Sequence, residues 1–142
     1  MLLVVVSIGE SRYAVDASHV VEVLPLLDTS PPAPLAPAAV SGICNYRGRP
    51  AAVIDLNRLA GLPAAPRLLS TRLLIVSRGS TYVALLAAAV TETIHLSPQD
   101  FLSPPSTEAS SPSWIGPMAR YGTGFLRRLE IDPLFDLAEA LR

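Results

Sequence analysis

The first third of this 142-residue chain recurs without gaps about seventy positions later. Each copy contains a short apolar run, a glycine turn and a second apolar run in the same order. A chain that repeats such a unit is expected to fold into two similar β-rich halves. Seven residues carry the repeat: Val6, Ser7, Gly9, Ala14, Ala17, Val20 and Glu22 recur as Val76, Ser77, Gly79, Ala84, Ala87, Val90 and Glu92.

Short apolar runs bounded by glycine, proline or polar turns predict β-strands. The segment 87–93 fits either a strand or a helical turn, and both alternatives stay open. Strands about five residues long, joined by tight turns, favour two small barrels over a parallel sheet. The predicted strands are 2–8, 13–15, 40–46, 49–55, 72–76, 82–86, 114–118 and 124–129.

Three short helical segments are predicted between these strands. Asp16 or Ser18 caps a turn that places Val20 and Val23 inward. The second helix follows Asp55, whose negative charge suits a helix N-terminus, and Gly61 ends it. A terminal helix begins at Asp132-Pro133, because proline is tolerated in the first turn. Its apolar stripe consists of Leu134, Leu137, Ala138 and Leu141.

The fold class is therefore all-β with short helices, and the chain is expected to form one domain, 1–142, with two lobes. We place the lobe boundary at roughly 62–71, and the first strand is free to pair with the second lobe. Four prolines make 30–37 a stiff connection. The polar, proline-rich segment 97–112 is expected to be the most mobile loop.

Composition argues against several classes of function. The basic residues are all arginine, which excludes lysine Schiff-base chemistry and a P-loop lysine. A net charge of −1 without a basic stripe gives nucleic acid nothing to bind. His19 and His95 lack neighbours at metal-ligand spacing, and Cys44, in an apolar strand, is expected to be an inert thiol. We expect no catalytic residue, no cofactor and no metal.

No apolar run approaches the ~20 residues of a membrane span. Met1–Val6 is apolar but lacks the basic residues of a signal peptide, and we interpret it as a strand. The chain is therefore expected to be cytoplasmic, without direct insertion into a membrane.

Two features point to a contact surface. Glu22 lies inside an apolar segment, where a carboxylate needs a cation or several donors, and Arg47, at a strand turn, is a suitable partner. The alternative is that both side chains point into water. The apolar stripe 20–27 exceeds what one short segment can bury, which favours a docking patch; core packing is the alternative.

With these residues assembled, the chain resembles the CheW family, the coupling proteins of bacterial chemosensory arrays. The resemblance covers nearly the whole chain and is carried mainly by two runs. The first is Arg12–Val23, which contains Val-x-Glu-Val. The second is Val40-Ser-Gly-Ile-Cys-Asn-Tyr-Arg-Gly48, followed by Val53-Ile-Asp-Leu56.

The resemblance implies two five-stranded SH3-like barrels around a shared core, and an adaptor that binds two partners. These are the regulatory domain of a CheA-type histidine kinase and the cytoplasmic hairpin tip of a chemoreceptor. It implies a location beside membrane-bound receptor arrays. Carried over by position, the partner-binding residues are Val20, Glu22, Gly42, Asn45, Arg47 and Gly48.

The chain departs from the family pattern at three places, the first being that its first strand starts at Met1, whereas family members commonly have a few more residues before it. Tyr46 stands where leucine is usual, and Ala84-Leu-Leu-Ala-Ala88 lacks an acid, which puts the usual contacts of the second lobe in doubt. The runs Val21–Leu27 and Trp114–Pro117 are more similar to couplers of Wsp-type surface-sensing pathways, which end in a diguanylate cyclase.

Two other hypotheses remain from the sequence. One is a small enzyme or ligand-binding β-barrel with a pocket between the lobes, which would need converging polar groups. The other is a detached regulatory domain that binds a kinase but no receptor.

Overall fold

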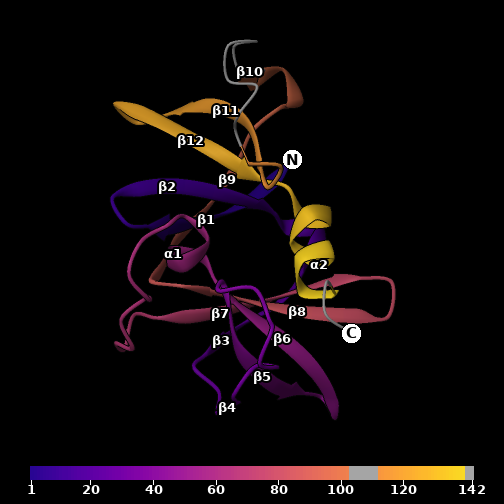
Figure 1. Cartoon of the computed structure of the whole chain (residues 1–142). Helices are drawn as coiled ribbons and strands as arrows, with labels where there is room; N and C mark the ends of the chain where they lie inside the picture. Colours follow the sequence, from indigo (N-terminus) through magenta and orange to yellow (C-terminus); the bar gives the residue numbers. More distant parts are fainter. Residues whose placement is uncertain (103–111, 140–142) are drawn as a thin grey trace.

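The computed structural model describes residues 1–102 and 112–139 as two six-stranded sheets, drawn one above the other in Figure 1. The sheet of the β1 lobe has the order β10 (Phe101–Leu102), β11 (Ile115–Tyr121), β12 (Gly124–Leu129), β2 (Ser11–Asp16), β1 (Leu2–Ile8), β9 (Ala89–His95). The sheet of the β7 lobe has the order β3 (Val20–Pro25), β7 (Arg72–Arg78), β8 (Thr81–Ala87), β6 (Arg49–Asp55), β5 (Val40–Tyr46), β4 (Thr29–Ser30).

The predicted all-β, two-lobed fold is confirmed, and the helices are short. Each sheet contains five strands of six or seven residues and one strand of two residues, β4 or β10. The helical elements are η1 (Ala17–His19), α1 (Leu56–Leu59), η2 (Pro98–Asp100) and α2 (Ile131–Glu139). Asp16 caps η1 and Asp55 caps α1, because each carboxylate accepts backbone N–H groups that the first turn leaves without partners.

The repeat in the sequence corresponds to a reciprocal exchange of strands. Each repeat begins with a hairpin, β1–β2 or β7–β8, and the strand that follows crosses to the other lobe. β3 pairs with β7, and β9 pairs with β1. Even the registers correspond, since Val20 lies opposite Val76 and Val6 lies opposite Val90, each beside a β-bulge. The lobes therefore cannot separate without breaking both sheets.

The second part of each repeat also occurs twice. β6 lies parallel to β8, and β12 lies parallel to β2. The amide of Asp55 donates to the carbonyl of Ala39 at 2.8 Å, and that of Glu130 donates to the carbonyl of Trp114 at 2.9 Å. Asp55 is the last residue of β6 and Glu130 directly follows β12, and each precedes a helix, so the helices α1 and α2 occupy corresponding positions.

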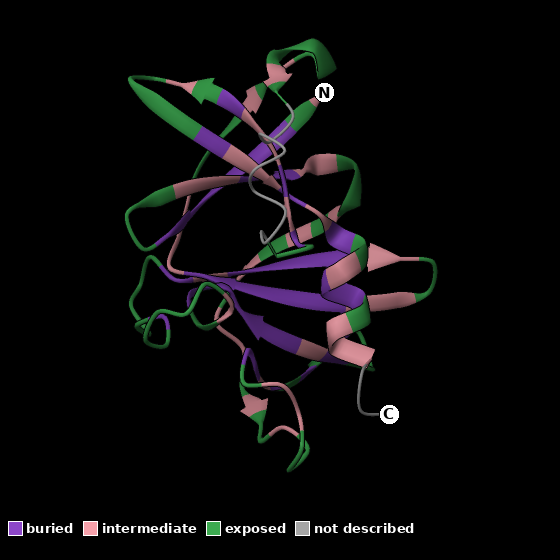
Figure 2. Cartoon of the chain, turned by 45° about the horizontal axis from the view of Figure 1, so that its top comes forward, coloured by how far each residue is buried: buried purple, intermediate pink, exposed green. Residues whose placement is uncertain are grey.

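The largest group of buried side chains joins the two sheets, and Figure 2 shows the buried strand segments where the sheets face each other. Smaller groups fill the interior of each lobe. Because the shared core is occupied by apolar side chains, it leaves no place for a polar inter-lobe site among the described residues. Its fully buried members include Val6, Ile54, Leu56, Leu74, Val76, Leu85, Leu134 and Phe135.

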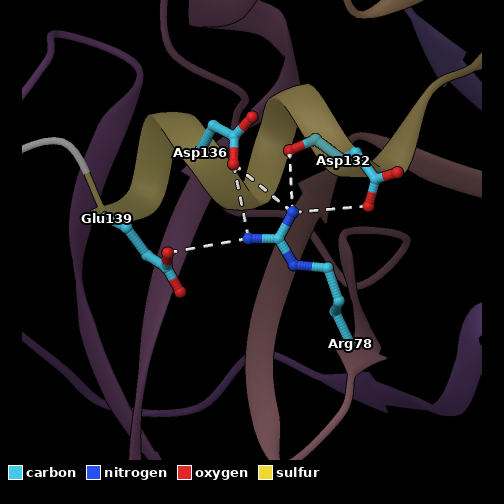
Figure 3. A network of polar contacts seen from close by, with 4 residues as sticks. All are labelled: Arg78, Asp132, Asp136 and Glu139. Atoms are coloured by element: carbon cyan, nitrogen blue, oxygen red, sulfur yellow. Dashed lines mark hydrogen bonds and ion pairs between the residues drawn. The ribbon is translucent and has the colours of Figure 1, made fainter.

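Helix α2 fastens the β1 lobe to the β7 lobe. Leu134 and Phe135 enter the shared core, while Arg78 at the end of β7 contacts three acids of the helix (Figure 3). The Arg78 guanidinium lies 4.9 Å from the centre of the Phe135 ring. Since the acids are largely solvent-exposed, the buried apolar side chains contribute most of the docking energy. The three acids are Asp132, Asp136 and Glu139.

The structure corrects or completes several local predictions. Val23 does not point inward but is 41% exposed, because β3 alternates with the two-residue period of a strand. The open segment 87–93 belongs mostly to strand β9. The predicted loop 97–112 begins with η2 and β10, and its part 103–111 lies outside the described residues. Leu141 of the predicted stripe also lies outside them.

Candidate partner-binding corner

The turn between β5 and β6 presents Arg47 in an unusual backbone conformation. Arg47 and Gly48 have φ values of 51° and 79°, the pattern of a type I′ hairpin. The Oδ1 atom of Asn45 accepts a hydrogen bond from the Gly48 amide at 2.9 Å and braces the turn. A left-handed conformation costs a residue with a Cβ about 1–2 kcal/mol. The surrounding contacts therefore hold Arg47 in a conformation that glycine would adopt more easily.

Glu22 reaches this turn because the sheet of the β7 lobe curls. β3 is an edge strand separated from β5 by three other strands, yet the Tyr46 hydroxyl donates a 2.5 Å hydrogen bond to Oε2 of Glu22. The predicted Glu22–Arg47 pair is also present, with Nη2 of Arg47 3.6 Å from the same oxygen. The Arg47 guanidinium lies 5.1 Å from the Tyr46 ring centre. We call Glu22, Asn45, Tyr46, Arg47 and Gly48 the Arg47 corner.

The Arg47 corner combines a buried tyrosine with an exposed ion pair. The hydrogen bond to Glu22, and then burial, raise the pKa of Tyr46, so the tyrosine keeps its proton and stays a donor. The side chains of Arg47 and Glu22 are 62% and 39% exposed. Water screens such a pair, so the ion pair adds little stability and Arg47 is accessible to a partner.

Tyr46 is the corner residue that sequence reasoning did not include among the binding residues. Its ring is buried, and the Tyr82 ring packs edge-on against it with centroids 5.1 Å apart. The sequence contained one indirect signal, because Tyr46 immediately precedes the turn where leucine is usual in the family it resembles. Its contact with Glu22 depends on the curl of the sheet, which local patterns do not specify.

The other two predicted binding residues lie apart from the corner. A Cβ atom at Gly42 would lie 2.6 Å from the carbonyl oxygen of Ser30, so glycine is needed where β5 lies closest to β4, its antiparallel neighbour. Val20, at the start of β3, is half-buried against the shared core. The structure thus brings Glu22, Asn45, Arg47 and Gly48 together in the Arg47 corner and places Gly42 and Val20 outside it. A partner role for any of the six stays a prediction.

The opposite face of β3 is apolar and exposed. Val21 and Val23 are 39% and 41% exposed, whereas Leu24, Leu26 and Leu27 pack against the interior of the β7 lobe. The stripe 20–27 is thus divided: part of it is core, and its outward valines remain at the surface. An exposed apolar pair on a strand that also carries Glu22 is typical of a contact surface.

The most enclosed pocket described has an apolar lining and a volume of about 290 Å³. It lies between the proline-rich segment 32–37, β5 and β6, and each described residue that lines it is Pro, Ala, Val or Ile. Such a lining offers no acid, base or nucleophile. Buried Cys44 lies elsewhere, and burial raises the pKa of its thiol, which disfavours the thiolate.

Two further properties concern the described part of the chain. It contains no group of three His, Cys, Asp or Glu side chains placed to hold a metal ion. None of its helices has the length and apolar character needed to cross a bilayer.

Comparison with known proteins gives the family of this tandem-repeat β protein with two interlocked lobes. A family model described as "CheW-like domain" matches residues 2–139. The chain belongs to the CheW family. It is 29% identical over 143 residues to "Chemotaxis protein CheW" of Treponema pallidum (strain Nichols), covering 96% of this chain and 83% of that protein.

A solved structure supports the fold. The crystal structure of the scaffolding protein TtCheW from Thermoanaerobacter tengcongensis superposes with a TM-score of 0.80 at 24% identity. The match covers 92% of this chain and 84% of the other.

Proposed function

We propose that this chain is a non-catalytic adaptor that couples chemoreceptors to a CheA-type histidine kinase. The observation that carries the proposal is the Arg47 corner, an exposed arginine held in a left-handed turn and flanked by Tyr46 and Glu22. Backbone strain that persists at an exposed charged residue points to a role in recognition. Membership of the CheW family supports the same reading.

The proposed partners are the receptor's cytoplasmic hairpin tip and the kinase regulatory domain. The chain offers distinct surfaces for them, because Glu22 of the Arg47 corner and the outward valines Val21 and Val23 lie on opposite faces of β3. Contacts of this kind bury ~1,200 Å² or less in weak complexes. Repetition within an array then raises the effective affinity.

The enzymatic or ligand-binding alternative receives no support from the described residues. It needs a pocket with converging polar groups, and the shared core between the lobes is filled by apolar side chains. The apolar pocket beside the segment 32–37 has no charged or hydroxyl-bearing residue among its described lining. The adaptor proposal needs no such pocket.

We propose that the adaptor lies on the cytoplasmic side of membrane-bound receptor arrays. We also propose that it serves a surface-sensing pathway that ends in a diguanylate cyclase. The pathway rests on the resemblance of Val21–Leu27 and Trp114–Pro117 to Wsp-type couplers. Expression in strains that lack either the surface-sensing or the swimming coupler tests it. Restored cyclic-di-GMP signalling supports the proposal, and restored swimming alone contradicts it.

Charge reversal at the corner tests the adaptor function. Binding of Arg47→Glu to a purified receptor cytoplasmic fragment, and separately to the kinase regulatory domain, is measured by isothermal titration calorimetry. We expect the affinity for at least one partner to fall by about tenfold or more, because like charges at an interface repel. Arg58→Glu, an equal charge change on α1, serves as the matched control and should bind like the parent.

Circular dichroism and thermal unfolding establish that both variants are folded. Binding of Arg47→Glu to both partners with parental affinity would contradict the proposed corner. Separate titrations also distinguish a full adaptor from a domain that binds a kinase but no receptor.

A further inference from the structure

The two contacts on Oε2 of Glu22 differ in strength. The Tyr46 hydroxyl lies 2.5 Å away, within hydrogen-bond distance, whereas Nη2 of Arg47 lies 3.6 Å away, beyond the usual range for such a bond. An O–H donor to a carboxylate forms a strong, charge-assisted hydrogen bond. Tyr46 therefore fixes the Glu22 carboxylate, and Arg47 is held only loosely by the same oxygen.

Tyr46 also supports Arg47 directly. The guanidinium carbon lies 5.1 Å from the ring centre, which is within the range of a cation–π contact. Packing fixes the ring itself, since the Tyr46 residue is only 4% exposed and Tyr82 lies edge-on against it. One buried ring thus orders both the acid from β3 and the arginine of the turn.

We propose that Tyr46 is the positioning residue of the Arg47 corner, and this rests on the adaptor function proposed above. Its hydroxyl holds Glu22 to one side, and its ring presents Arg47 outward with guanidinium N–H groups directed at solvent. A guanidinium of this kind recognises a carboxylate of the partner through paired hydrogen bonds. Ordering the arginine before binding reduces the entropy lost when the partner docks.

The raised pKa of Tyr46 agrees with this role, because the hydroxyl keeps its proton throughout the physiological range. The backbone agrees as well. Arg47 is the only non-glycine residue with positive φ among the described residues, so its Cα position is fixed by the turn and its side-chain direction by Tyr46. Sequence position alone does not show this second constraint.

Three variants separate the hydroxyl from the ring. Tyr46→Phe removes the hydrogen bond and keeps the ring, and Tyr46→Leu removes both. Tyr121→Phe is the matched control, because Tyr121 precedes the corresponding turn of the β1 lobe and its hydroxyl forms no hydrogen bond with the described residues. The probes are the same receptor fragment and kinase domain, and affinity is measured by titration calorimetry.

We expect Tyr46→Phe to weaken binding to the partner that reads Arg47 by about threefold to tenfold, and Tyr46→Leu to weaken it further. Tyr121→Phe should leave the affinity unchanged. In a Glu22→Gln background, Tyr46→Phe should have a smaller effect, since the two residues act through one hydrogen bond.

A spectroscopic readout distinguishes positioning from loss of fold. The NMR order parameter of the Arg47 Nε–Hε group should fall in Tyr46→Leu, which removes the ring, while backbone amide shifts outside the corner stay in place. Parental affinity in Tyr46→Phe together with an unchanged order parameter in Tyr46→Leu would overturn the positioning role even if Arg47→Glu loses binding. Parental affinity of Arg47→Glu would instead overturn the adaptor corner itself.

Discussion

The turn between β5 and β6 and the turn between β11 and β12 occupy corresponding positions in the two lobes, yet only the first forms a polar corner. Each turn follows a tyrosine, Tyr46 or Tyr121. In the first, Arg47 and Gly48 both have positive φ; in the second, Gly122 alone does, at 59°. The two lobes thus share the same frame, while the side chains of the two turns differ.

The acids that correspond in the repeat diverged in the same way. Glu22 accepts from Tyr46, whereas the counterpart, Glu92, is exposed and makes no side-chain hydrogen bond or ion pair with the described residues. The turns of the hairpins β1–β2 and β7–β8 each begin with a glycine, Gly9 or Gly79, at φ near 60°. Among the hairpin turns that the structure describes, arginine therefore takes the first position only between β5 and β6, which supports a specific role for that turn.

The largest expected effect is at Gly42 of the β7 lobe, whose close approach to Ser30 has a counterpart at Gly116 of the β1 lobe, where a Cβ would lie 2.9 Å from the carbonyl oxygen of Arg128. We expect Gly42→Ala to lower the free energy of unfolding by about 1–3 kcal/mol, because the new Cβ would lie 2.6 Å from the backbone oxygen of Ser30. Gly124→Ala in the β1 lobe is the matched control, since that Cβ would meet no atom within 4 Å. Urea unfolding followed by circular dichroism measures both.

This variant also separates two interpretations of Gly42. If Gly42→Ala is as stable as the parent but no longer binds the receptor fragment or the kinase domain, Gly42 is itself a contact residue and its steric role is wrong. If stability falls and the residual folded protein binds normally, the glycine serves the close approach of β4 and β5 in the sheet.

Exchanging the chemistry of the two turns sharpens the comparison. Gly122→Arg should cost about 1–2 kcal/mol, because the new side chain meets an unfavourable left-handed backbone without the support of the Arg47 corner. Arg47→Asn should be neutral or stabilise by up to about 1 kcal/mol, since asparagine tolerates this conformation. Thermal unfolding gives both changes.

Arg47→Asn should nevertheless bind the proposed partners more weakly, as expected where strain serves recognition. A clear loss of stability in Arg47→Asn would show that the arginine belongs to the frame of the lobe and not to its recognition surface.

Much of this architecture follows from local patterns in the sequence. The strands at 40–46 and 49–55 match β5 and β6, the cap at Asp55 is confirmed, and Asp16 is the cap of the two alternatives, Asp16 and Ser18, that the sequence offered. These features depend on neighbours a few residues apart, such as an apolar run, a turn glycine or a capping carboxylate. The repeat predicted two similar halves because the same local patterns recur about seventy residues later.

Features that depend on distant partners were harder to predict. The repeat does not say that β3 and β9 exchange between lobes, because identical halves could equally pair internally. Val23 was assigned inward from a helical turn, and the bulged edge strand β3 reversed that direction. The hydrogen bond from Tyr46 to Glu22 needs the curl of a whole sheet, so the sequence predicted the ion pair of Glu22 but missed the closer donor.

The smallest expected effect concerns the two segments that lead into β3 and β9, the strands that are exchanged between the lobes. The chain enters β3 through η1, whose first turn is capped by Asp16, while the corresponding position before β9 is the buried Leu86. Oδ1 of Asp16 accepts from the Ser18 amide at 2.9 Å. We expect Asp16→Ala to cost about 0.5–1 kcal/mol at pH 7, the range for loss of an N-cap.

The dependence on pH isolates the contribution of the charge at this cap. Burial opposes ionisation of Asp16, but hydrogen bonds from Ser18 and the nearby cations His19 and Arg128 outweigh it and lower the pKa below the unfolded value of 3.8. The stabilisation is therefore complete above that value and is lost as the pH falls through the lower folded pKa. Asp16→Asn keeps a neutral acceptor at the cap, so its free energy of unfolding should approach that of the parent in acid. Urea unfolding at several pH values measures this difference. A difference that does not change with pH would contradict the role of the charge.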